Sequence, residues 1–183
     1  MIDPDTSHLL GRLILGRSVA SLATLHDGRP FASMIPYAVL VTGRDPKRED
    51  GAGDDAGSVV LVSHVSRLSS HTRDMLSTPE VCLLVTAPES PPGSSSPPQA
   101  LPRVSLPALA TFIDPAHPAH EPLKRAYLDR FPHAADWFQL GDFSIVVFEP
   151  TSARFIAGFA RAMTLSPQQL HAAVAAAAVD AGG

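Results

Sequence analysis

The sequence predicts a mainly β domain, an antiparallel barrel that is closed or partly closed, with helices at the periphery. About seven apolar segments of strand length follow one another, several in hairpin-like succession. The dipeptide Asp27-Gly28 between the first two is a strong signal for a tight hairpin. Helical patterns occur at the ends and in two connections instead of alternating with the strands, which disfavours a parallel sheet.

The first expected strand covers residues 19–26, and the chain returns along residues 31–41. Pro36 interrupts this second segment, and because proline cannot donate to a ladder it marks an edge, a bulge or a strand end. Pro107 interrupts a later strand in the same way. The remaining expected strands are residues 58–63, 81–86, 103–113, 143–149 and 154–160.

Helices are expected from apolar spacing and capping residues. A short N-terminal helix covers residues 5–17, with Asp5, Thr6 or Ser7 as its cap. Ser166 and Gln169 form a capping box, so a C-terminal helix begins at about residue 166. The other expected helices are residues 66–77, 117–131 and 133–138, and the segments 42–57 and 88–98 are expected to be mobile loops.

Composition limits the class of protein. The 183 residues fit one domain over 1–183, with 45% hydrophobic and 17% charged residues. A formal net charge of -4 gives no broad basic surface, so nucleic acid is not an expected partner. The one cysteine, Cys82, lies in an apolar run and is expected to be a small buried hydrophobe in a reducing compartment. Without a signal peptide or a long apolar span, we expect a cytoplasmic protein that does not enter a membrane.

The segment from Ser63 to Arg73 is the most informative for chemistry because it follows a strand and opens a helix. Unpaired backbone N–H groups at a helix start favour an anion, and hydroxyl groups add donors. If Ser66 is the cap, Arg67 and His71 lie four residues apart on one face and together could hold a phosphate. The alternative is an ordinary capped helix with polar, exposed side chains.

Other motifs are weaker. His117 and His120 are three residues apart, but no further Cys or carboxylate completes a metal site, so none is predicted. Any of the eight histidines could be an axial haem ligand, and nothing local selects one. The sequence has no Walker loop, dinucleotide fingerprint or nucleophile elbow. No catalytic residue is assigned.

Five segments occur in an order that resembles the pyridoxamine 5'-phosphate oxidase-like FMN-binding split-barrel family, and most narrowly its haem-utilisation branch. Residues 17–37 (RSVASLATLHDGRPFASMIPY) resemble the opening of that branch, and residues 63–84 resemble its next signature. Residues 102–106 resemble the following strand, and Asp142-Phe143 with Gly158-Phe159 resemble the closing motif. The resemblance covers roughly residues 10–170.

This resemblance implies a six-stranded antiparallel Greek-key split β-barrel that forms a homodimer, with FMN in two clefts between the subunits. Arg103 would reach the phosphate from the other subunit. Residues beside the flavin ring and ribityl chain would be Ser33, Met34, Ile35 and Pro36, and those around the phosphate would be Ser63, Ser66, Arg67, Ser69 and His71.

Three functions follow from this resemblance. The first is an FMN-dependent oxidoreductase of unknown substrate, in which FMN carries the redox chemistry. The second is a protein that binds or degrades haem or another tetrapyrrole on the same barrel. The third is a cofactor-free dimeric binding protein, because a fold does not settle a function. A visible spectrum would separate the first two, since bound haem has a Soret band and FMN is yellow.

Overall fold

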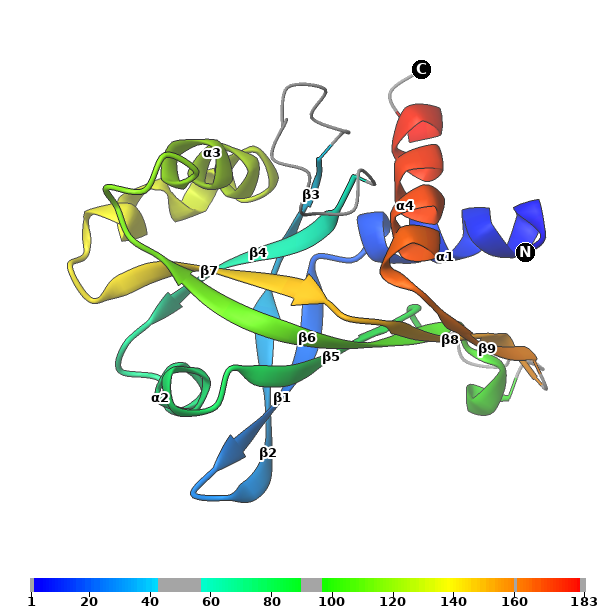
Figure 1. Ribbon diagram of the computed structural model, residues 1–183, viewed down its shortest axis with the longest axis horizontal. Coiled ribbons are helices and arrows are strands. Elements are labelled where there is room, and N and C mark those ends of the chain that lie inside the picture. The colour runs from blue at the N-terminus through cyan, green and yellow to red at the C-terminus, as the bar shows by residue number, and fades with distance from the viewer. Residues whose placement is uncertain (1, 43–56, 90–96, 160, 182–183) are drawn as a thin grey trace, which may run out of the picture.

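A computed structural model describes residues 2–42, 57–89, 97–159 and 161–181 (Figure 1). Most of the two expected mobile loops therefore lies outside the described residues. The helices are α1 (Pro4–Gly16), α2 (Ser70–Ser77), α3 (His120–Arg130) and α4 (Pro167–Ala181), with 3-10 helices η1 (Pro98–Ala100) and η2 (Pro132–Gln139). The strands are β1 (Val19–His26), β2 (Arg29–Pro36), β3 (Ala38–Val41), β4 (Val59–Ser66), β5 (Glu80–Thr86), β6 (Arg103–Ile113), β7 (Phe143–Pro150), β8 (Ala153–Gly158) and β9 (Arg161–Leu165).

All strand pairs are antiparallel, and the main order is β2-β1-β5-β6-β7-β4-β3. The two ends of this order, β2 and β3, are consecutive parts of the chain separated by Tyr37 alone. Counting β2 and β3 as one interrupted strand gives the six predicted barrel strands, and the β8–β9 hairpin extends the sheet beside β6. The mainly β split-barrel class is confirmed. The sheet is not closed, because β2 pairs only with β1 and β3 pairs only with β4 among the described strands.

The two prolines that were expected to interrupt strands, Pro36 and Pro107, lie where a backbone donor is not needed. Pro36 ends β2, as predicted, and Tyr37 then crosses to β1 by donating its N–H to the Ser18 carbonyl at 3.0 Å. Pro107 lies inside β6, between the part that pairs with β8 and the part that pairs with β7. The missing N–H of proline therefore interrupts neither ladder.

The turn and capping signals of the sequence are largely confirmed. Asp27 (φ 51°) and Gly28 (φ 73°) both adopt left-handed backbone conformations, as a two-residue hairpin turn requires. The Ser166 N–H donates to Gln169 Oε1 at 2.9 Å and the Gln169 N–H donates to Ser166 Oγ at 3.3 Å, which is the predicted capping box. The N-terminal helix begins earlier than expected, because Asp3 is its cap and accepts the Thr6 N–H at 3.0 Å.

Two hydrophobic clusters organise the molecule. One fills the barrel interior and continues to α1 and α4. These two helices can pack closely because Gly11 has no side chain: a Cβ there would lie 2.4 Å from the Ala173 carbonyl oxygen. The second cluster lies between α3 and the outer face of β3, β4 and β7. Figure 1 shows α3 on one side of the sheet and the α1–α4 pair on the other, with α2 and the β1–β2 hairpin below. As a result β4 is buried on both faces.

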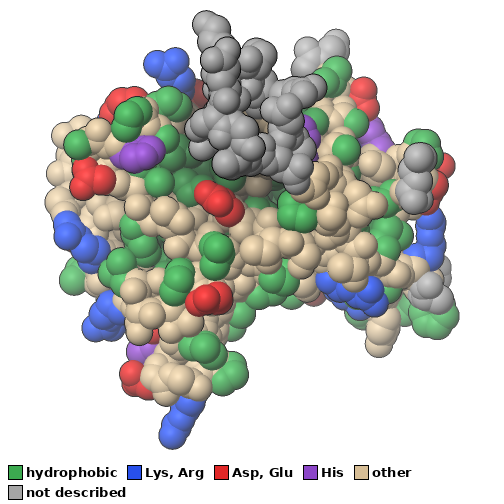
Figure 2. Space-filling view, viewed as in Figure 1, with side chains coloured by type: hydrophobic (Ala, Val, Ile, Leu, Met, Phe, Trp, Pro, Cys, Tyr) green, Lys and Arg blue, Asp and Glu red, His purple; other side chains and the backbone are tan. Residues whose placement is uncertain are grey.

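The surface fits the charge expectation. On the face drawn in Figure 2, the Lys and Arg side chains are dispersed, with acidic side chains between them, and form no continuous basic patch among the described residues. No helix in the described part of the chain is both long and apolar enough to cross a membrane.

Candidate functional site

A buried histidine lies in the most aromatic part of the molecule. Val60, Val62 and His64 follow one another on the face of β4 that packs against α3. His64 is 7% exposed, and its ring stacks on Phe138 of η2 with centroids 3.8 Å apart and planes 5° apart. Phe143 and Tyr127 lie 4.9 and 6.0 Å away by the same measure. Three aromatic rings therefore hold the imidazole from three different elements.

The electrostatics of His64 are unusual for a core residue. Burial lowers the pKa of His64 to about 4, with a smaller contribution from the nearby His120. The imidazole is therefore neutral at pH 7. Its Nδ1 is buried and has no hydrogen-bond partner among the residues that the structure describes. Since buried polar atoms are nearly always paired, this unpaired nitrogen needs an explanation.

The same imidazole lies at the wall of a cavity of about 540 Å³. Such a volume is within the range of small-molecule and cofactor sites. Lys124 and Arg67 bring cations to the cavity, and Asp114 is the single carboxylate among its lining residues. The other lining residues are Phe112, Ile113, Pro115, His120, Phe138, Leu140, Gly141, Phe143, Ser144 and Ile145.

A second polar cluster, formed by Thr24, His26 and Asp74, lies beside α2, and both oxygens of its carboxylate are hydrogen-bonded. Asp74 is 5% exposed, and its carboxylate accepts from Thr24 Oγ1 at 2.8 Å and pairs with His26 Nδ1 at 2.8 Å. Although burial raises the pKa of Asp74, these two hydrogen bonds outweigh it and hold the pKa below its ordinary value. The hydrogen bond to Asp74 raises the pKa of His26. This cluster ties α2 to β1 and borders a cavity of about 500 Å³ that is also lined by Arg73.

The predicted helix cap at Ser66 is wrong. Ser66 still pairs with Phe143 as the last residue of β4, and α2 begins only at Ser70 with Ser69 as its cap. The Ser66 hydroxyl donates to Asp142 Oδ2 at 2.6 Å, which holds the strand end to the start of β7. A continuing strand ladder therefore prevailed over the local capping preference of serine.

Arg67 consequently does not share a helical face with His71. Arg67 lies in the turn after β4, and its guanidinium donates to the Gly141 carbonyl. It lines the His64 cavity, whereas His71 lies half-buried in α2, where burial lowers its pKa. The predicted Arg67–His71 pair is not formed within the chain.

Of the remaining predicted phosphate residues, Ser69 and His71 lie at the start of α2, whereas Ser63 lies within β4. The Ser69 side chain makes no capping hydrogen bond, and the His71 ring makes none to the described residues. Ser63 is buried and donates to the Pro36 carbonyl at 2.7 Å, which joins β4 to the end of β2. These residues retain free donors at Ser69 and His71 only.

The four predicted flavin neighbours alternate across β2. The side chain of Ile35 is in the barrel core, so only its backbone could face an outside ligand. Met34 is 64% exposed on the opposite face. Ser33 points inward, and its buried Oγ has no hydrogen-bond partner in the structure.

Arg103 lies far from α2 within one chain. It begins β6, and its Nη1 donates to the Gln99 and Leu101 carbonyls at 3.1 Å each. The α2 end of β6 is near Leu109, which pairs with Glu80. Six strand residues separate the two positions by roughly 20 Å. Arg103 can therefore join the α2 residues only from a second subunit.

The outer face of β2, β1, β5 and β6 carries many apolar side chains. Neighbouring strands place Ala32, Ala23, Cys82 and Pro107 in one row across this face. Exposed apolar side chains flank the row, with Leu84 37% exposed. The expected buried cysteine is thus half-buried on a surface, where burial raises its pKa. A face of this kind is typical of a protein interface.

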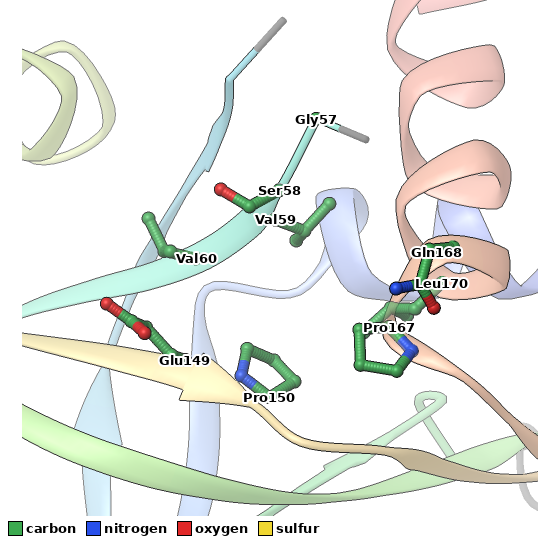
Figure 3. A pocket seen from close by; sticks show the side chains of 9 residues that line it. All are labelled: Gly57, Ser58, Val59, Val60, Glu149, Pro150, Pro167, Gln168 and Leu170. Atoms are coloured by element: carbon green, nitrogen blue, oxygen red, sulfur yellow. The ribbon is translucent and has the colours of Figure 1, made fainter. Parts of the chain in front are cut away.

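A third cavity, of about 270 Å³, opens between the start of β4, the end of β7 and the start of α4 (Figure 3). Its lining includes Glu149, Pro150 and Pro167, and no Lys, Arg, His or Cys is found among the described residues that line it. The described lining therefore offers fewer functional groups than that of the His64 cavity.

Sequence reasoning overlooked His64 and the Thr24–His26–Asp74 cluster. His64 interrupts an otherwise apolar strand, VVLVSHV, and a polar residue within a strand buried on both faces is a signal for a special role. This signal could be interpreted only with the position of α3 known, because a single sequence does not show which face of the barrel a helix covers. For Asp74, no local pattern points to a partner 50 residues earlier in the chain.

The family model for the CREG β-barrel matches residues 11–172, which is most of the chain. The chain belongs to the CREG β-barrel family. The resemblance to the oxidase-like split barrels also holds at the level of structure: a Clostridium acetobutylicum protein of the pyridoxinephosphate oxidase family has a TM-score of 0.60 at 9% identity, covering 92% of this chain and 99% of that chain.

Two relatives of this CREG β-barrel chain are named for haem. The chloroplast non-canonical haem oxygenase HOZ of Arabidopsis thaliana is 29% identical over 174 residues, covering 92% of this chain and 46% of that protein. A haem-binding protein from Mycobacterium smegmatis has a TM-score of 0.72 at 23% identity, covering 94% of this chain and 62% of that chain. The chain thus spans about half the length of the curated relative. The likeness to the solved structures shows the fold alone.

Proposed function

We propose that this protein binds haem in the cavity beside His64. The observation that carries the proposal is the combination, in one cavity, of aromatic walls, a buried neutral imidazole and cations. Haem needs an apolar slot for its macrocycle and an axial ligand for its iron. Its two propionates favour cationic partners such as Lys124 and Arg67. The residues present therefore fit the group, and the unpaired Nδ1 of His64 is consistent with a missing partner.

The haem-related names of the Arabidopsis and mycobacterial relatives support the same proposal. When bound, haem would supply iron-centred redox chemistry, and the protein would hold and orient it. The proposed function is haem binding and does not extend to haem cleavage.

A titration with ferric haem tests this function. Wild-type protein is expected to develop a Soret band of bound haem that saturates near one haem per chain. Lys124→Glu places a like charge beside the propionates and should weaken binding about 5- to 30-fold, corresponding to about 1–2 kcal/mol. Arg125→Glu is the matched control, because it makes the same charge change on an exposed position of α3 outside the cavity lining.

The proposal fails if wild-type protein gives no saturable Soret band. The cavity assignment fails if Lys124→Glu and Arg125→Glu weaken haem binding equally, since a general change in net charge would then account for both.

FMN binding by the residues at the start of α2 and on β2 is the second candidate, and a specific observation favours it. Ser33 has a buried hydroxyl without a partner, and the cap residue Ser69 leaves its side chain unused. This site would need Arg103 from a second copy of the chain. The apolar face of β2, β1, β5 and β6 would supply the contact for such a homodimer.

Arg103→Ala tests the FMN candidate. Loss of one charge-assisted contact of roughly 1.5–3 kcal/mol should weaken FMN binding about ten- to hundredfold, while riboflavin, which lacks the phosphate, should be nearly unaffected. The unfolding midpoint must be measured in parallel, because Arg103 also donates to two carbonyls in its own chain. Equal losses for FMN and riboflavin would rule out the phosphate assignment.

A further inference from the structure

The structure distinguishes among the eight histidines that the sequence leaves equivalent. Three are hydrogen-bonded or ion-paired at the surface: His26 to Asp74, His8 to Asp180 at 3.3 Å, and His117 to the Ala119 N–H at 3.1 Å. Three more lie elsewhere: His71 in α2, His171 beside Gly57 on α4, and His133 exposed on η2. Only His64 and His120 line the aromatic cavity among the described residues.

The packing around His64 fixes the plane of its imidazole. Phe138 covers one ring face at 3.8 Å, and Lys124 lies 5.3 Å from the centroid of Phe138 on η2. Stacking leaves the two ring nitrogens in the plane of the imidazole, where the lone pair of a metal ligand must be. A ring held in one orientation is a better ligand than a freely rotating one, because less entropy is lost on binding.

The two histidines of the cavity share one feature and differ in another. The Nδ1 of each is buried and has no hydrogen-bond partner among the described residues. His120, however, lies in the first turn of α3, with its Nδ1 3.4 Å from Glu121 Oε1. No aromatic stack fixes the His120 ring among the described contacts.

We propose that His64 is the axial ligand to the iron of haem bound in this cavity, with Phe138 as the residue that positions its ring. This inference rests on the proposed haem-binding function. His120 is then a wall of the cavity and not the ligand.

The test separates binding of the macrocycle from coordination of the iron. Ferric haem and metal-free protoporphyrin IX are each titrated into wild type, His64→Ala, His64→Gln and His120→Ala. Both His64 variants should shift the Soret band and lower haem affinity about tenfold or more. Their affinity for protoporphyrin IX, followed by fluorescence, should stay within about threefold of wild type because no iron is involved. Protoporphyrin binding also reports that each variant is folded.

Added imidazole should restore the wild-type Soret position in His64→Ala, because it can occupy the space left by the side chain. His120→Ala should leave the Soret position unchanged. A haem spectrum insensitive to both His64 substitutions, or a spectrum that changes in His120→Ala instead, overturns the ligand assignment alone. Failure of wild type to bind either porphyrin overturns the proposed function and this inference together.

Discussion

His64 and His26 occupy opposite environments on two sides of the same barrel. His26 is 43% exposed and is paired with a carboxylate that is itself fully hydrogen-bonded, so its pKa is raised. His64 is buried among aromatic rings with an unpaired nitrogen, so its pKa is lowered. In the first arrangement the buried carboxylate has its hydrogen-bond partners within the chain, and these bonds tie α2 to β1. The second leaves one buried ring nitrogen without a partner among the described residues, and such a group needs an explanation, for which we propose a bound ligand.

The two regions also differ in how much of a site one chain supplies. The described lining of the His64 cavity comes from β4, β6, β7, α3, η2 and the turns beside them, all within one chain. The α2 region leaves its predicted cation, Arg103, roughly 20 Å away. Dimerisation should therefore affect the two candidate ligands differently.

Leu84→Arg should have the largest effect, because it places a charge in the apolar outer face of the sheet. We expect a homodimer for wild type and at least a roughly 100-fold weaker association for the variant, since an unpaired buried charge at an interface is strongly unfavourable. Light scattering at micromolar concentration measures this. Haem affinity should stay within about threefold, whereas FMN affinity should fall with the dimer.

Leu76→Arg is the matched control, because Leu76 is exposed on α2, outside this face. A wild-type monomer would remove the FMN candidate. A parallel loss of haem binding in Leu84→Arg would show that the His64 cavity depends on the second subunit.

Asp74→Ala should destabilise the fold by about 3 kcal/mol, because a buried hydrogen-bond acceptor with two partners is removed. Thr24→Val, which removes one partner and keeps the shape, should lower the free energy of unfolding by only about 1 kcal/mol. Urea unfolding at pH 7 measures both. Equal effects of the two substitutions would mean that the His26–Asp74 pair contributes nothing to stability.

In the ligand-free protein, His64 and His26 should change the free energy of unfolding in opposite directions as the pH falls. The folded pKa of His64 is lowered from 6.5 to about 4, so the unfolded state binds more protons between these values and stability falls as the pH falls through this window. Between pH 7 and pH 5 the loss should be about 2 kcal/mol. His64→Phe should remove that part of the pH dependence.

The contribution of His26 has the opposite sign. Its folded pKa is raised, so its stabilisation is present below the unfolded pKa and is lost as the pH rises through the folded pKa. His26→Gln should therefore reduce stability on the acidic side. If His64→Phe leaves the acid dependence as it is in wild type, His64 is not buried in its neutral form.

Arg67→Ala should have the smallest effect on the stability of the ligand-free protein. Its guanidinium is exposed and donates to one carbonyl, so the free energy of unfolding should change by less than about 1 kcal/mol. FMN affinity should be unchanged, because Arg67 faces the His64 cavity and not α2. A tenfold loss of affinity for FMN with no loss of affinity for riboflavin would mean that Arg67 does contact the FMN phosphate.

Local signals in the sequence predicted the parts of the fold that local chemistry determines. Asp27-Gly28 specified its hairpin, Pro36 its strand end, and Ser166 with Gln169 the start of α4. Ser66 shows where such reasoning stops, since its cap preference yielded to pairing with Phe143, a partner 77 residues away. The hairpin partner β9 was also missed, because its residues have no clear strand alternation.

The candidate site was less predictable than the fold. Ser63, Ser69 and His71 could be grouped because they are close in sequence. His64 acquires its role from Phe138 and Tyr127, which only the packing of α3 and η2 brings to it. The resemblance named haem as an alternative ligand, and His64 is the histidine that we propose for it.

Hydrogen–deuterium exchange with and without saturating ferric haem tests the central claim most directly, because it shows which region receives the ligand. We predict slower exchange in η2 and in residues 112–124, which line the His64 cavity, with little change in β2 and α2. Slower exchange confined to residues 29–36 and 69–77, with none in η2, would contradict the account and place the ligand at the α2 side of the barrel.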